Sequence, residues 1–162
     1  LDFTELNKFI VDSDCELPGR KDLVCLVGRY NYAATIDVVS CFTNIELHKD
    51  FRRFFCIGWR GKVYSFNRVP FGLRCAPACC QTVTAALSLD AVVVYLDGFL
   101  VLGESEEALR RKVSNQVLTL EKNGLPGQYG SLHQVSAHDR RQSNVVTGCI
   151  SVGCIHNRQA SS

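Results

Sequence analysis

The segment that most constrains the fold lies at residues 92–102, where two apolar runs flank an Asp-Gly pair in the sequence VVVYLDGFLVL. An Asp-Gly pair between apolar runs is the strongest short-range signal for a tight β-hairpin. Both arms are almost wholly apolar, so we expect them to be buried and to hold the carboxylate of Asp97 firmly at the tip. A fixed carboxylate in that place is either a turn residue or a metal ligand, and this segment alone leaves both interpretations open.

A second carboxylate follows another apolar strand. Asp37 comes near the end of the run YAATIDV at residues 32–38. If this strand lies beside the hairpin, Asp37 and Asp97 sit side by side and repel each other unless a cation lies between them. Hard oxygen ligands of this kind suit Mg²⁺. Asp residues also end strands for purely structural reasons, so these residue types leave a metal site and a pair of turn residues as alternatives.

Periodicity in the rest of the chain predicts an α+β fold. Residues 54–59 and 63–66 form two apolar, aromatic strands around a turn, and residues 76–89 and 104–123 have helical patterns. The last helix is the clearest, because Ser105 can cap its first turn and a glycine follows its end. The order strand, hairpin, helix, hairpin, helix is typical of helices packed on an antiparallel sheet.

The two ends of the chain are less well specified. Residues 1–10 are expected to form a short helical or extended segment, and residues 15–32 are rich in loop signals. Beyond residue 125 the pattern has neither a helical nor a strand period, except for a possible strand at residues 145–155. We therefore predict one domain over residues 1–125 and a poorly specified tail over residues 126–162.

The bulk composition excludes some classes of protein. A chain of 162 residues can bury a core of one domain. No apolar run approaches the roughly 18 residues that span a bilayer, so we expect no membrane partner. The nine cysteines are odd in number, the chain is not small, and several cysteines lie inside apolar runs, which predicts a reducing, intracellular compartment, the cytoplasm or the nucleus.

Positive charge gathers between residues 49 and 74, where seven basic residues face one acid, Asp50. Aromatic residues alternate with them, and Lys or Arg beside rings that stack on bases is typical of nucleic-acid surfaces. A solvated charged face over a β-core is the alternative. The basic residues of interest are Arg52, Arg53, Arg60, Lys62, Arg68 and Arg74.

Five segments resemble, in order, the motifs of a reverse transcriptase, an RNA-directed DNA polymerase of retrotransposons and retroviruses. LDFTELNKFI resembles the fingers segment, IDVVSCF the first catalytic motif, FNRVPFGLRCAP the template and nucleotide motif, VVVYLDGFLVLG the YxDD hairpin, and SEEALRRKVSNQVLTLEKNGL the helix after it. The PFGL form is more similar to retrotransposons than to retroviruses. The resemblance covers residues 1 to about 125 and implies a palm with partial fingers and no thumb.

The resemblance also implies roles for single residues. Asp37 and Asp97 would bind two Mg²⁺ ions (or Mn²⁺), with the backbone carbonyl of Val38 as a further ligand, and transfer a nucleotide to a primer 3′ end. Phe42 would select deoxynucleoside triphosphates by excluding a 2′-OH, and Tyr95 would lie against the primer. Phe71, Gly72 and Leu73 would line the nucleotide and template pocket, and the basic residues named above would contact an RNA or DNA template.

Three departures from the family predict an impaired copy. The second Asp of the YxDD motif is Gly98, which removes one of three carboxylates and predicts a loss of about 10³-fold or more in rate. Thr4 stands where the fingers usually carry an Arg that grips the triphosphate. The sequence after residue 125 resembles no further palm or thumb segment.

Two alternatives to a polymerase remain at this point. One is a non-catalytic nucleic-acid-binding module that uses the basic and aromatic face at residues 49–74. The other is a chain without a selected function that folds poorly, because its palm sheet lacks the last strands.

Overall fold

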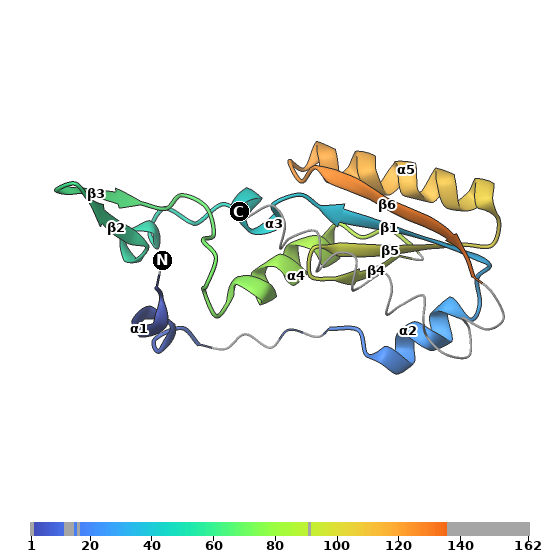
Figure 1. Cartoon of the computed structure of the whole chain (residues 1–162), viewed down its shortest axis with the longest axis horizontal. Coiled ribbons are helices and arrows are strands. Elements are labelled where there is room, and N and C mark those ends of the chain that lie inside the picture. The colour runs from blue at the N-terminus through green and yellow to red at the C-terminus, as the bar shows by residue number, and fades with distance from the viewer. Residues whose placement is uncertain (1, 12–14, 16, 91, 136–162) are drawn as a thin grey trace.

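A computed structural model describes residues 2–11, 15, 17–90 and 92–135 of the chain (Figure 1). The helices are α1 (Thr4–Asn7), α2 (Arg20–Val27), α3 (Cys41–Asn44), α4 (Ala76–Ala86) and α5 (Glu106–Lys122), with a 3-10 helix at Arg52–Phe54. The strands are β1 (Tyr32–Val38), β2 (Cys56–Trp59), β3 (Lys62–Ser65), β4 (Val92–Tyr95), β5 (Gly98–Gly103) and β6 (Gly127–Gln134). The α+β class with an antiparallel sheet is therefore confirmed.

A four-stranded antiparallel sheet in the order β4-β5-β1-β6 forms the body of the molecule. Side chains alternate between its two faces, as the period of a strand requires. From β1, Ile36 and Val38 face a core shared with α4 and α5, whereas Ala33 faces α2 with Leu102 of β5. Helices thus cover both faces of the sheet, and the strand that carries Asp37 lies in its middle (Figure 1).

The other end of the molecule holds a smaller cluster and a two-stranded ribbon. Phe3, Phe55 and Leu73 pack together there, with Val69 and Ala76 completing the cluster. Strands β2 and β3 extend beyond this cluster as an antiparallel ribbon, well away from the main sheet (Figure 1). The strand pair predicted around residues 60–62 is confirmed.

Helix α2 corrects the sequence prediction, which made this stretch loop-rich. Leu23 and Val27 lie four residues apart, on one face of the helix, and both are buried against Ala33 and Leu102. A helix of only eight residues has little stability of its own. Packing on the sheet stabilises α2, and the short sequence pattern of this stretch did not reveal that the sheet would cover it.

Strand β6 is a second correction, because the prediction placed no strand between residues 126 and 144. This strand pairs with β1 along the edge of the sheet, with a register irregularity between Ala34 and Ile36. At that irregularity a Cβ on Gly130 would collide with the side chain of Thr35. The glycine that hid the strand pattern is thus what lets the two backbones approach. The predicted strand at residues 145–155 lies outside the described residues.

Within the described part of the chain, no helix is both long enough and apolar enough to cross a membrane.

Candidate active site

The sheet brings the two candidate aspartates to the same end. In the antiparallel pairing of β1 with β5, Asp37 lies directly opposite Gly98, the residue after Asp97. The N–H of Val38 donates a hydrogen bond of 2.9 Å to the carbonyl oxygen of Asp97. Asp37 and Val38 therefore lie next to Asp97 across one strand pair, which meets the condition that the strand of Asp37 lies beside the hairpin.

The turn of this hairpin differs from the predicted Asp-Gly turn. Gly98 is the first residue of β5 and pairs with Tyr95, so the two turn residues are Leu96 and Asp97. Leu96 has φ 55°, in the left-handed region, whereas the φ of Gly98 is not positive. The glycine is thus not needed for the turn, and the left-handed position falls on a leucine instead. We call β4, Leu96–Asp97 and β5 together the sheet hairpin.

Position 98 has room for a side chain. An ideal Cβ on Gly98 would lie 3.6 Å from Oδ1 of Asp37 and 3.5 Å from the carbonyl oxygen of Tyr95, both ordinary contact distances. The backbone of Gly98 and the space around its Cα are therefore compatible with a residue that has a Cβ, which would lie beside Asp37.

Burial dominates the electrostatics of Asp97. Desolvation raises the pKa of its carboxyl group above the usual value, the direction expected for a carboxylate removed from water. Cys80 lies nearby in the core, and the pKa of its thiol is raised by a hydrogen bond with Cys41, by burial and by the charge of Asp97. The carboxylate therefore has apolar and weakly polar neighbours, and a bound cation would stabilise its charge.

The donor atoms fit a divalent cation only in part. Carboxylate oxygens of Asp37 and Asp97 and the carbonyl oxygen of Val38 are hard ligands of the type that Mg²⁺ and Mn²⁺ accept. Among the described residues, no three His, Cys, Asp or Glu side chains come together closely enough to hold a metal ion. A cation here would depend on two side chains, one backbone oxygen, solvent and substrate.

Residues of the predicted nucleotide pocket lie in two environments. The half-buried ring of Phe42 meets the exposed ring of Phe71 edge to face, with 5.6 Å between the ring centroids and 67° between the planes. Gly72 has φ 93°, which favours glycine, and its carbonyl oxygen accepts a hydrogen bond from Nδ2 of Asn7. Leu73 is buried among Phe3 and its neighbours, so its side chain belongs to the core of the fingers end.

Tyr95 is the last residue of β4, next to the turn, and 37% of its side chain surface is exposed. Its position leaves the ring accessible beside the two aspartates.

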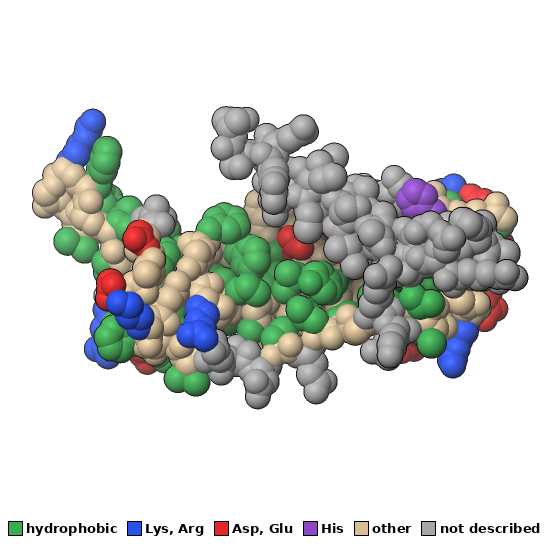
Figure 2. Space-filling model, turned by 60° about the horizontal axis from the view of Figure 1, so that its bottom comes forward, with side chains coloured by type: hydrophobic (Ala, Val, Ile, Leu, Met, Phe, Trp, Pro, Cys, Tyr) green, Lys and Arg blue, Asp and Glu red, His purple; other side chains and the backbone are tan. Residues whose placement is uncertain are grey.

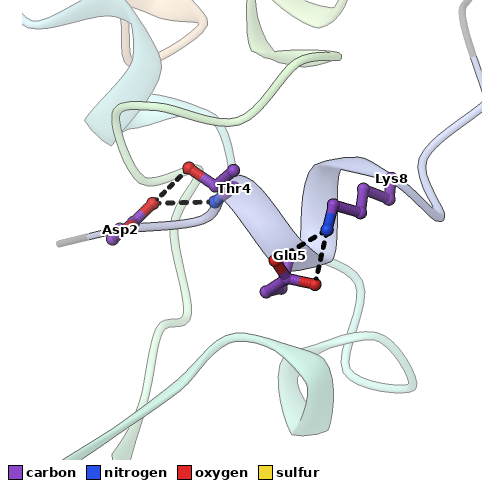
Figure 3. Close-up of polar contacts among 4 residues, drawn as sticks. All are labelled: Asp2, Thr4, Glu5 and Lys8. Carbon is purple, nitrogen blue, oxygen red and sulfur yellow. Dashed lines mark hydrogen bonds and ion pairs between the residues drawn. The ribbon is translucent and has the colours of Figure 1, made fainter.

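The N-terminal segment offers little positive charge to a triphosphate. Oδ1 of Asp2 accepts hydrogen bonds from the backbone N–H of Thr4 at 2.9 Å and from its hydroxyl at 2.5 Å (Figure 3). Both bonds with Thr4 lower the pKa of Asp2. The ammonium of Lys8 pairs with Glu5 at 2.7 Å. The position of the family's arginine is thus occupied by a threonine that is tied to its own helix start.

The basic and aromatic residues divide between structural and exposed positions. The guanidinium of Arg52 pairs with Glu46 at 2.8 Å, and Arg68 donates to the carbonyl oxygen of Asn44. In contrast, Arg53 lies over the ring of Phe54 at 4.8 Å, and other basic residues of this group are exposed: Arg60, Lys62 and Arg74. Arg68 is exposed as well, so of the six basic residues only Arg52 is partly buried.

The exposed ribbon, which consists of β2, Arg60–Gly61 and β3, is the most accessible of these surfaces. Trp59 is 62% exposed and Val63 is 77% exposed, and Arg60 lies over the Trp59 ring at 5.8 Å. Figure 2 shows hydrophobic and basic side chains side by side at this end of the molecule. Such a surface can stack on bases and neutralise phosphates.

Sequence reasoning missed two buried polar residues of α4 that contact the sheet hairpin. Gln81 and Thr84 both form hydrogen bonds with the backbone of Leu96, next to Asp97. They lie three residues apart on a helix face that is otherwise apolar. Polar residues at that spacing on a buried face were the signal available in the sequence.

The chain matches a family model and several known proteins. The model described as reverse transcriptase (RNA-dependent DNA polymerase) matches residues 1–127. The Retrovirus-related Pol polyprotein from transposon 412 of Drosophila melanogaster is 27% identical over 118 residues, which are 70% of this chain and 10% of that protein. The corresponding polyprotein from transposon gypsy is 26% identical over 110 residues, 65% of this chain and 11% of its own length.

Solved structures show the same fold. The protease-reverse transcriptase of prototype foamy virus superposes with a TM-score of 0.67 and 20% identity, over 78% of this chain and 17% of that one. A foamy viral protease-reverse transcriptase in complex with double-stranded DNA gives a TM-score of 0.70 at 20% identity, over 78% of this chain and 23% of that one.

The chain spans about a tenth of the length of the curated relatives named above. The family match covers most of the described residues and includes both aspartates. The chain therefore belongs to the reverse transcriptase family.

Proposed function

We propose that this chain is the fingers and palm part of a retrotransposon-type RNA-directed DNA polymerase with weak or absent polymerase activity. The single observation that carries the proposal is the geometry at position 98. Asp37 and Asp97 are in place, and a Cβ at Gly98 would point to within 3.6 Å of Asp37 Oδ1, but no third carboxylate is there. The site thus has the scaffold for metal-dependent nucleotidyl transfer and an incomplete set of ligands.

In this proposal Asp37, Asp97 and the carbonyl oxygen of Val38 hold the divalent cation, Mg²⁺ or Mn²⁺. When bound, a cation at such a site neutralises the triphosphate and favours ionisation of the primer hydroxyl. Phe42, braced by Phe71, forms the wall that excludes a 2′-OH, and Tyr95 lies against the primer end. Glycine at position 98 leaves part of the positive charge without compensation, which is expected to lower the rate by about 10³-fold or more.

The proposed partners are a primed RNA or DNA template and deoxynucleoside triphosphates. Two of the foamy viral relatives were solved in complex with an RNA/DNA hybrid and with double-stranded DNA, which supports this choice. Of the basic residues, Arg53, Arg60, Lys62, Arg68 and Arg74 are exposed and are proposed to contact the template, whereas the partly buried Arg52 pairs with Glu46 and binds the carbonyl oxygen of Leu47. The cysteines of the described part form no disulfide, which agrees with action in the cytoplasm or nucleus.

Primer extension on an RNA template with Mg²⁺ or Mn²⁺ tests the polymerase proposal. The wild-type chain is expected to extend the primer slowly or not at all, and Gly98→Asp is expected to raise the rate. Asp37→Ala should abolish whatever extension is seen. Fast extension by the wild-type chain that survives Asp37→Ala would refute the assignment of the active centre.

A second candidate is a non-catalytic nucleic-acid-binding module, favoured by the exposed ribbon with its Trp59–Arg60 pair. It predicts binding of single strands or hybrids that weakens with salt and does not change in Asp37→Ala. Binding that is indifferent to salt concentration would rule it out.

A further inference from the structure

Two side chains of α4 connect this helix to the tip of the sheet hairpin. Oε1 of Gln81 accepts a hydrogen bond of 2.6 Å from the N–H of Leu96, and its Nε2 donates to the carbonyl oxygen of Val94 at 3.2 Å. The hydroxyl of Thr84 lies 2.7 Å from the carbonyl oxygen of Leu96 and 2.8 Å from that of Cys80, so its single proton is shared between the hairpin turn and α4. Gln81 is 7% exposed and Thr84 is fully buried, so water cannot easily replace these partners. We call this pair of side chains the α4 clamp.

The residue that the clamp holds has an unfavourable backbone conformation. Leu96 has φ 55°, in the left-handed region, which is unfavourable for a residue with a side chain. Both polar groups of Leu96, its N–H and its carbonyl, bind to the clamp. Asp97 is the next residue, so the direction of its carboxylate depends on the conformation that the clamp stabilises.

We propose that Gln81 and Thr84 are positioning residues of the active centre, which fix the turn at Leu96 and so hold Asp97 opposite Asp37. The inference rests on the proposed function only for what Asp97 does. The turn itself is held from a helix on the other side of the core rather than by turn residues within the hairpin. Neither clamp residue touches the reacting groups in this account.

The alternative is that the hydrogen bonds of Gln81 and Thr84 only stabilise the core and have no specific effect on the turn. The chain offers a matched control that separates these two roles. Gln116 of α5 is fully buried and forms the same two kinds of bond: Oε1 accepts from the N–H of Leu89 at 3.0 Å, and Nε2 donates to the carbonyl oxygen of Leu87 at 2.9 Å. Those bonds hold the connection between α4 and β4, not the turn. Gln116→Leu therefore removes equivalent hydrogen bonds away from Asp97.

The test is NMR spectroscopy of the full chain, with amide hydrogen exchange and the backbone ¹³C shifts of Leu96 and Asp97. In Gln81→Leu we expect the Leu96 amide to exchange about tenfold faster relative to the core amides, and its ¹³Cα shift to leave the left-handed range. In Gln116→Leu we expect lower stability but unchanged signals at Leu96 and Asp97. Should Gln81→Leu not fold, Thr84→Val, which keeps the volume, carries the same test.

A rescue variant distinguishes the effect of the Thr84 hydroxyl from the effect of the shape of its side chain. Thr84→Ser keeps the donor and is expected to restore the wild-type shifts that Thr84→Val loses. Thr82→Val is the control on the same helix, because the Thr82 hydroxyl is exposed and bonds only within α4, to Ala78.

Unchanged Leu96 signals in both clamp variants, or equal changes in Gln116→Leu, would overturn the proposal. Neither readout needs polymerase activity, so primer extension that survives Asp37→Ala would refute the proposed function without deciding the clamp.

Discussion

The sheet hairpin and the exposed ribbon have the same local structure and opposite surroundings. Each is a pair of antiparallel strands joined by two residues. In the sheet hairpin, Phe99, Leu100, Val101 and Leu102 are all buried, whereas no residue of β2 or β3 is buried. Strand pairing thus says little about function here, and the side chains' surroundings say more. The arms of the first hairpin are buried beside Asp97, and the side chains of the second are exposed.

The turns of the two hairpins also differ in what stabilises them. Arg60 and Gly61 in the ribbon both have positive φ, 49° and 75°, and glycine occupies one of these positions at no steric cost. In the sheet hairpin the positive φ falls on Leu96, and Gln81 and Thr84 hold it by hydrogen bonds. One turn is favoured by its own sequence, and the other depends on two side chains of the preceding helix, 12 and 15 residues before Leu96.

The largest expected effect is on stability. Phe99→Ala removes a side chain that is 1% exposed in the middle of the main core, and is expected to cost about 3–5 kcal/mol of unfolding free energy. Val63→Ala in the ribbon should change it by no more than about 0.5 kcal/mol. Urea unfolding measures both. A similar loss in the two variants would mean that the ribbon packs against the body in solution.

Glycines in the two regions give a second contrast. Gly130→Ala places a Cβ against Thr35 across β1 and β6, and is expected to destabilise the chain by about 1–3 kcal/mol. Gly58→Ala in β2 is the control, because a Cβ there meets nothing within 4 Å. Thermal unfolding measures the stability of both variants. Equal stability of Gly130→Ala and Gly58→Ala would contradict the pairing of β6 with β1.

Nucleic-acid binding should depend on the ribbon and not on the sheet hairpin. Trp59→Ala is expected to weaken binding of a single strand by about 1–3 kcal/mol, through lost stacking. Lys62→Ala should lower the slope of affinity against salt concentration by about one phosphate contact. Fluorescence anisotropy over a salt series measures both effects. Arg111→Ala, at an exposed position of α5, removes the same charge elsewhere, and an equal loss in that variant would locate binding on another face.

The smallest effect concerns the pH dependence of stability. Burial raises the pKa of Asp97, so the folded chain holds this proton more tightly than the unfolded chain, whose value is near 3.8. The contribution to stability is complete below that value and is lost as the pH rises through the folded pKa. Asp97→Asn cannot ionise, so it should be more stable than the wild type at neutral pH, and this advantage should vanish in acid. Asp90→Asn at an exposed position is the control, and urea unfolding at each pH decides.

Much of the fold and of the candidate site could be predicted from local sequence patterns. The remaining features depend on tertiary contacts, which those patterns do not reveal. Strand β1, helix α5 with its Ser105 cap, and the placement of Asp37 beside Asp97 follow from apolar periodicity and spacing. Helix α2 and strand β6 do not, because packing on the sheet stabilises one and close approach to Thr35 requires glycine in the other. The turn was misjudged for a related reason. Asp-Gly is a good turn pair in isolation, but hydrogen bonds from α4 moved the left-handed position to Leu96.

If Gly98 leaves the active centre one carboxylate short, a carboxylate at position 98 should strengthen cation binding, and Mn²⁺ titration of the full chain by calorimetry measures this change. We expect Gly98→Asp to bind Mn²⁺ at least about tenfold more tightly than the wild type, and Asp37→Asn to remove that gain. Gly58→Asp adds the same charge to the ribbon and should leave the affinity unchanged. Equal affinity of Gly98→Asp and the wild type, or a gain that persists with Asp37→Asn, would contradict the account.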